Sequence, residues 1–104
     1  MLIEMRTYQI APARVADYLR LFESRGLAIQ REVLGNLIAC FSTEIGPLNQ
    51  VVYLWGYDSY EERELRRARL AALPEWMDYV AQVVPLFASQ DTRLVKGTAF
   101  SPIR

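Results

Sequence analysis

Histidine is absent from the 104 residues, and cysteine occurs only once, at position 40. Histidine is the side chain most often used for proton transfer near neutral pH and the commonest ligand of transition metals. Its absence excludes histidine-based catalytic triads, and we expect no metal site and no cofactor. One cysteine cannot form an internal disulfide. Cys40 lies in an apolar run, so we expect a small buried hydrophobe and not a nucleophile.

The sequence also lacks net charge and long apolar runs. Lys and Arg number 12, as do Asp and Glu, so no long-range field attracts nucleic acid or an anionic membrane, and we expect neither partner. No window reaches the roughly 18 apolar residues of a membrane span. Glu4 and Arg6 fall where a signal peptide would be apolar. We therefore expect a cytoplasmic protein.

What is present fits one packed domain. The chain is 52% hydrophobic and 23% charged, and its length suits a single core. No internal repeat or low-complexity segment interrupts it. We therefore expect one domain over residues 1–104.

Residue spacing predicts four strands, at 2–10, 37–45, 51–57 and 86–97. Residues 2–10 alternate, with Glu4, Arg6 and Tyr8 on one side. The turn Gly46-Pro47-Leu48-Asn49 joins the second and third strands as a hairpin.

Apolar residues at steps of three or four predict the helices. The first begins at Pro12 and bends at Gly26. Its apolar pattern reaches Val33, and Gly35 ends it. The second begins at the capping residues 58–59 and ends near residue 73, and a short third helix covers 74–85. This order predicts an α+β fold, the ferredoxin-like split β-α-β sandwich, in which a four-stranded antiparallel sheet carries its helices on one face.

The strand at 51–57 has two apolar sides. Val52, Leu54 and Gly56 are expected to face the helices, because they are the smaller residues. The opposite side carries large rings at alternate positions, where an exposed sheet would be polar. We therefore expect that side to pack against a second copy in a homodimer; its residues are Val51, Tyr53, Trp55 and Tyr57.

Glu4, Arg6 and Tyr8 extend this side onto the first strand, and two interpretations remain open for their charges. They form a structural ion pair, or they form the polar wall of a cavity for a small molecule. The ion pair alone explains charges of both signs. The candidate cavity comprises Glu4, Arg6, Tyr8, Tyr53, Trp55 and Tyr57.

Three arginines share one face of the second predicted helix: Arg63, Arg66 and Arg67. They either grip an anionic ligand or form a solvated face with Glu62–Arg66 and Glu64–Arg67 pairs. The spacing favours the solvated face, and no phosphate site is predicted.

Several motifs resemble the NIPSNAP family almost from end to end. They are E-M-R-T-Y at 4–8, T-E-I-G-P-L-N-Q-V-V at 43–52, L-W-G-Y-D-S at 54–59, P-E-W at 74–76 and S-Q at 89–90. The resemblance implies a dimeric α/β barrel, in which two ferredoxin-like sheets face each other. NIPSNAP proteins are mostly without an assigned activity. Many relatives carry His where this chain has Tyr53, which weakens the case for catalysis.

Two functions follow as hypotheses. The first is a homodimeric, non-catalytic module that binds a small molecule or a protein. The second is a cofactor-independent enzyme, a monooxygenase or isomerase, in which Arg6 stabilises an enolate and Tyr8 or Tyr53 relays protons.

Overall fold

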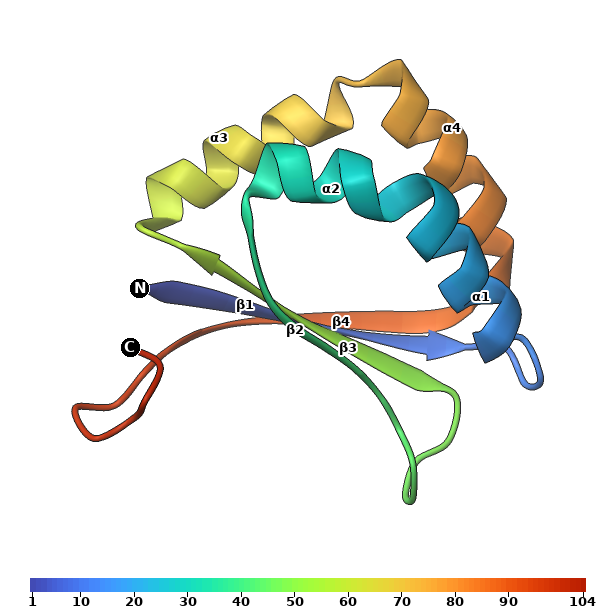
Figure 1. The fold of residues 1–104 in the computed structure, drawn as a ribbon, viewed down its shortest axis with the longest axis horizontal. Helices are drawn as coiled ribbons and strands as arrows, with labels where there is room; N and C mark the ends of the chain where they lie inside the picture. The colour runs from blue at the N-terminus through green and yellow to red at the C-terminus, as the bar shows by residue number, and fades with distance from the viewer.

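The computed structural model describes residues 1–104 and consists of one antiparallel sheet with its helices on one side (Figure 1). The strands follow the order β2-β3-β1-β4 across the sheet. Their bounds are Leu2–Ile10 (β1), Asn36–Ser42 (β2), Gln50–Tyr57 (β3) and Phe87–Lys96 (β4). All three strand pairings are antiparallel, which confirms the predicted four-stranded sandwich.

The helices lie between the strands in the predicted order. Their bounds are Val15–Leu21 (α1), Phe22–Gly26 (η1, a π turn), Leu27–Leu34 (α2), Tyr60–Ala71 (α3), Pro74–Val83 (α4) and Val84–Leu86 (η2, a 3₁₀ turn). No helix has the length and apolar character needed to cross a membrane.

The predicted bend at Gly26 is the end of the π turn between α1 and α2. Gly26 itself has ordinary helical angles, so its role is not conformational freedom. A Cβ at this position would lie 2.7–3.0 Å from ring carbons of Tyr79. The glycine therefore allows α4 to approach the first helix closely.

The ends of two helices follow the predicted signals. Gly35 has a φ of +91° after α2, a conformation that side-chain-bearing residues rarely adopt. Ser59 caps α3, because its Oγ accepts a hydrogen bond of 3.1 Å from the Glu62 amide. Strand β2 stops at Ser42, three residues earlier than predicted, and Ile45 beyond it is 93% exposed.

The predicted assignment of the two sheet faces is wrong. Tyr53 and Trp55 are 2% and 1% exposed within one protomer, where they pack under its own helices. Val52 and Leu54 lie on the face that no helix covers. Both rows of β3 are apolar, so alternation shows that two faces exist but not which one the helices cover.

Cys40 also differs from expectation, because it is exposed and not buried. It lies opposite Tyr53 on β2, an edge strand. Desolvation by the surrounding sheet still raises the pKa of the thiol above its usual value, which does not favour a nucleophile.

Candidate functional site

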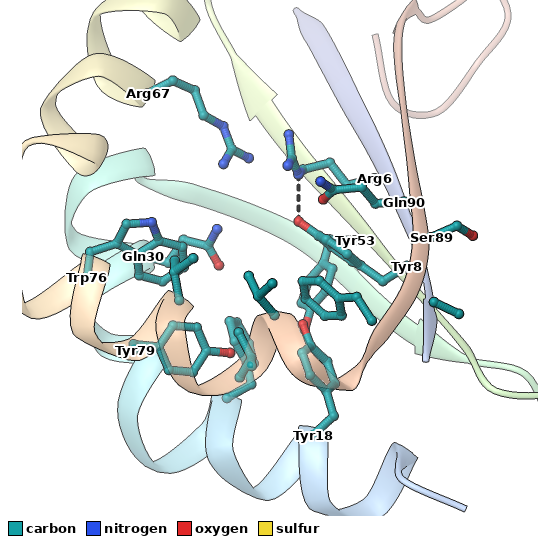
Figure 2. A pocket seen from close by; sticks show the side chains of 16 residues that line it. Arg6, Tyr8, Tyr18, Gln30, Tyr53, Arg67, Trp76, Tyr79, Ser89 and Gln90 are labelled. Atoms are coloured by element: carbon teal, nitrogen blue, oxygen red, sulfur yellow. Dashed lines mark hydrogen bonds between the residues drawn. The ribbon is translucent and has the colours of Figure 1, made fainter. Parts of the chain in front are cut away.

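A cavity of about 410 Å³ lies between the sheet and the helices (Figure 2). Residues from β1, β3, β4 and every α-helix contribute to its wall. The larger part is apolar, comprising Phe22, Trp76, Val80, Val83, Val84, Phe87 and Ala88 with four tyrosines. The polar part comprises Arg6, Gln30, Arg67, Ser89 and Gln90. A volume of this size and a mostly apolar wall are typical of small-molecule sites.

The predicted cavity residues divide into two groups. Arg6, Tyr8 and Tyr53 line the cavity, although it lies inside one protomer and not between two sheets. Glu4, Trp55 and Tyr57 share their face of the sheet but are buried outside the lining. That the six residues bind a ligand stays a prediction.

Aromatic rings hold the cavity wall together. Tyr8 stacks on Phe87 of β4 with ring centroids 4.8 Å apart. Phe22 meets Tyr53 edge to face at 5.1 Å, which joins η1 to β3. Such pairs add to the stabilisation from burial and fix the ring positions. The apolar wall is therefore largely formed before any ligand arrives.

Two tyrosine hydroxyls meet at the wall. The hydroxyl oxygens of Tyr18 and Tyr53 are 2.7 Å apart and hydrogen-bonded. Burial raises the pKa of Tyr53, and the neighbouring Tyr18 raises it further. Burial likewise raises the pKa of Tyr18. Both phenols stay protonated near neutral pH, so they can donate hydrogen bonds but cannot act as bases without a strong driving force.

A buried carboxylate lies beside one end of the cavity. Glu4 is 0% exposed, and its two oxygens accept hydrogen bonds from three arginines of β1 and α3. Arg63 donates from Nε at 3.0 Å and Nη2 at 2.5 Å, and Arg67 donates from Nε at 3.1 Å and Nη2 at 2.7 Å. Arg6 donates from Nη1 at 3.2 Å. We call these four residues the Glu4 cluster.

The arginines overcome the cost of burying the Glu4 carboxylate. Burial alone would raise the pKa of Glu4, but the charge of Arg67 and the hydrogen bond from Arg63 outweigh it, and the pKa falls below its usual value. The hydroxyl of Tyr57 also donates to Glu4 at 3.2 Å. The cluster is therefore ionised and ties α3 to the middle of the sheet.

The structure shows what each of these charged residues contacts within the protein. The predicted Glu4–Arg6 ion pair is present at 3.2 Å. The predicted solvated face of α3 is wrong for Arg63 and Arg67, whose side chains are 16% and 19% exposed. Arg66 does pair with Glu62 as predicted, at 2.8 Å, whereas Glu64 pairs with Arg63.

Sequence reasoning missed most of the cavity wall. Tyr18 and Phe22 were on the predicted apolar stripe of the first helix, but a stripe does not show which of its members leave a gap. For Arg67 the sequence does offer an indication, because it shares a helical face with Arg63 that could bind an anion. For Gln30 and Trp76 the sequence offers no indication beyond their positions in predicted helices.

The profile of the NIPSNAP family matches residues 3–102. The chain belongs to the NIPSNAP family. Among curated NIPSNAP proteins, it is 32% identical to the NipSnap homologue of Dictyostelium discoideum over 92 residues, 88% of this chain and 40% of that protein. The chain thus spans well under half of this relative. A NIPSNAP family protein from Agrobacterium tumefaciens has a solved structure with 41% identity and a TM-score of 0.97, covering 99% of this chain and 98% of that one.

The fold extends beyond NIPSNAP proteins. The crystal structure of an antibiotic biosynthesis monooxygenase superposes with a TM-score of 0.67 at 13% identity, over 94% of this chain and 99% of that one. At this identity the likeness concerns the fold alone.

Proposed function

We propose that this NIPSNAP domain is a homodimeric module that binds a small organic molecule in the cavity between its sheet and helices. The cavity itself carries the proposal, because about 410 Å³ remains open in a chain whose surrounding side chains are well packed. Protein interiors are close-packed and contain few voids larger than a water molecule. The mixture of fixed rings and a few polar groups supplies both affinity and orientation.

Binding is favoured over catalysis by the chemistry of the wall. No Asp, Glu, Lys or Cys lines the cavity, and its tyrosines Tyr18, Tyr53 and Tyr79 have pKa values raised by burial. The wall therefore offers no group ready to accept a proton near neutral pH.

One observation keeps an enzyme as the second candidate. Arg6 lies in the cavity, where its Nε donates a hydrogen bond of 2.8 Å to the Tyr8 hydroxyl. In that arrangement the Arg6 cation could stabilise an enolate, and the Tyr8 phenol could give the enolate a proton. The two hypotheses separate with Arg6→Ala and Tyr53→Phe: unchanged turnover of an identified substrate by both variants would remove this mechanism.

The uncovered sheet face supports the homodimer. Phe41 and Val95 on this face are 56% and 38% exposed, and Met5, Val52 and Leu54 are half-buried between them. Apolar residues on an open face indicate a partner surface. Asp91 and Arg93 lie at its β4 edge, so a two-fold axis can place each opposite its complement in a second copy.

Two measurements test these proposals separately. Light scattering should report about twice 12.0 kDa for the chain, and Leu54→Lys should reduce it to the mass of one chain. Native mass spectrometry and thermal shifts over a metabolite panel should show a bound ligand, and Val80→Trp should abolish it by filling the cavity. Leu65→Trp, at a site 62% exposed on α3, is the matched control and should change neither. An empty wild-type protein with no shift across the panel would contradict binding.

A further inference from the structure

We propose that the ligand is a small organic monoanion, an aryl or branched alkyl carboxylate, whose carboxylate lies between Arg6 and Arg67. This inference rests on the proposed binding function and names the chemical class of its ligand. Both guanidinium groups lie at the same end of the cavity in Figure 2. Their charge, their unused donors and the apolar remainder of the wall support this class of ligand.

The charge at this end is not balanced within the protein. Three arginines contact Glu4, and Glu64 meets only Arg63, at the surface. One positive charge is therefore left over. No Asp or Glu lines the cavity to neutralise it. The arginine side chains are only 16–19% exposed, so a surplus positive charge among them is poorly solvated and favours a ligand with one negative charge.

Unused hydrogen-bond donors lie in the same place. Arg6 uses Nε for Tyr8 and Nη1 for Glu4, and its Nη2 makes no hydrogen bond with another residue. Arg67 uses Nε and Nη2 for Glu4, and its Nη1 makes none. No buried side-chain nitrogen or oxygen lacks a partner, so these two atoms are reached from open space. Two free guanidinium amino groups match the two oxygens of a carboxylate.

Gln30 supplies a third polar contact. It is only 5% exposed, it lines the cavity, and Figure 2 shows its carboxamide pointing into the open volume. Its amide takes part in none of the side-chain hydrogen bonds, and since no fully enclosed side-chain nitrogen or oxygen lacks a partner, the amide is reached from the cavity. A polar group that faces a cavity without a protein partner is expected to bond a ligand or water. Gln30 can therefore hold a second oxygen of the ligand at a point away from the arginines.

The rest of the wall favours a ligand whose remaining part, beyond the carboxylate, is apolar. Beyond the arginines the cavity is bounded by Phe22, Trp76, Tyr79, Val83 and Phe87. These side chains come from three separate elements, η1, α4 and the start of β4. A phosphate ester or dianion fits less well, because the surplus is a single positive charge. A hydrophobic carboxylate satisfies both ends of the cavity.

The test uses three naphthalene probes that differ only in the polar group: 2-naphthylacetate, 2-naphthylacetamide and 2-(2-naphthyl)ethylamine. Titration calorimetry with the full chain should show the carboxylate binding roughly ten- to a hundredfold more tightly than the amide, the ratio expected for a charged hydrogen-bonded contact. The amine should bind more weakly still. Inorganic phosphate at the same concentrations should not compete.

Arg67→Met keeps the aliphatic stem but removes the donor and the charge, and it should bring the affinities of acid and amide together. Because Arg67 also holds Glu4, Gln30→Leu is the second variant: 2-naphthylacetate has no oxygen beyond its carboxylate, so this variant should keep the preference for the acid over both the amide and the amine. The probe comparison on the wild-type chain needs no variant at all.

The outcomes separate the two proposals. Equal affinity for acid and amide, with Val80→Trp abolishing both, would overturn the carboxylate and leave small-molecule binding in place. No binding by these probes, nor by a panel of aryl and branched alkyl carboxylates, would overturn the carboxylate. Small-molecule binding would then fail as well if the metabolite panel gave no shift.

Discussion

The two faces of the sheet are both apolar along β3, yet they differ in the size of their side chains and in the groups that lie beside those side chains. The face under the helices carries Tyr53, Trp55 and Tyr57 together with a buried carboxylate, and it encloses a cavity. The other face carries the smaller Val52 and Leu54, which stay half-exposed in one protomer. Large rings span the distance to helices that stand away from the sheet, whereas small residues suit close contact with a flat surface. The larger rings thus lie on the helix-covered face, where more space separates the sheet from what packs on it.

The largest effect expected from this comparison is that of Trp55→Ala. Deleting a ring that is 1% exposed should lower the free energy of unfolding by about 3 to 5 kcal/mol. Leu54→Ala, one residue away on the open face, should cost less than half as much. Urea denaturation of both variants at equal concentration measures the difference. A Trp55→Ala protein as stable as the wild type would show that the helices do not cover the ring face.

Replacing the buried carboxylate tests what holds α3 to that face. Glu4→Gln leaves Arg6, Arg63 and Arg67 without their shared partner, and we expect a loss of roughly 3 kcal/mol. Glu64→Gln removes only a carboxylate that is 51% exposed, so its effect should be near zero. Thermal melts of the two variants compare them directly. Equal losses would mean that the Glu4 cluster contributes no more than a surface pair.

Alkaline pH should weaken the helix-covered face through Tyr57. Burial raises the pKa of Tyr57 to about 12, with Glu4 among the contributors. A raised pKa stabilises the fold fully below the ordinary value near 10, and this contribution is lost as the pH rises through 12. The loss should approach about 2 kcal/mol. Unfolding free energies between pH 9 and 12 should fall less steeply in Tyr57→Phe, and identical slopes would contradict the assignment.

The sequence is sufficient to predict the fold, but not to predict which face of the sheet the helices cover. Alternation at 2–10 and 51–57, the Gly35 stop and the Ser59 cap each act through local backbone chemistry, and the structure confirms them. Both rows of β3 are apolar, so alternation does not show which row faces the helices. Contacts with segments remote in the sequence decide it, and no local pattern contains them.

The candidate site shows the same division. Arg6, Tyr8 and Tyr53 were predicted together because they share one face of adjacent strands, and they do line the cavity. Arg67 and Gln30 come from two helices whose rotation over the sheet is decided by packing. The arginine face of α3 was interpreted as solvated, since i to i+4 spacing cannot reveal that Glu4 lies 59 and 63 residues away in the chain yet within hydrogen-bond distance.

Gly26→Ala tests the contact that brings α4 over the same face. In an exposed helix this change would stabilise by about 1 kcal/mol. Here the added methyl would meet the Tyr79 ring at under 3 Å, so we expect a loss of about 1 to 3 kcal/mol. In a Tyr79→Leu background the loss should shrink or change sign. Chemical denaturation of the four proteins gives the coupling, and purely additive effects would show that the ring is not the obstacle.

The smallest effect should come from Arg66, which lies next to Arg67 on α3 but outside the Glu4 cluster. Its Nε donates to Glu62 at 2.8 Å and its Nη1 to the Val33 carbonyl at 3.1 Å, and its side chain is 30% exposed. Because the ion pair between Arg66 and Glu62 is partly exposed to water, Arg66→Met should change the free energy of unfolding by less than about 1 kcal/mol. It should also leave the affinity for 2-naphthylacetate unaltered, whereas Arg67→Met removes the preference for the acid. If Arg66→Met weakened that affinity as much as Arg67→Met, the general positive charge of α3 would attract the anion, and the two unused guanidinium groups in the cavity would not be what selects it.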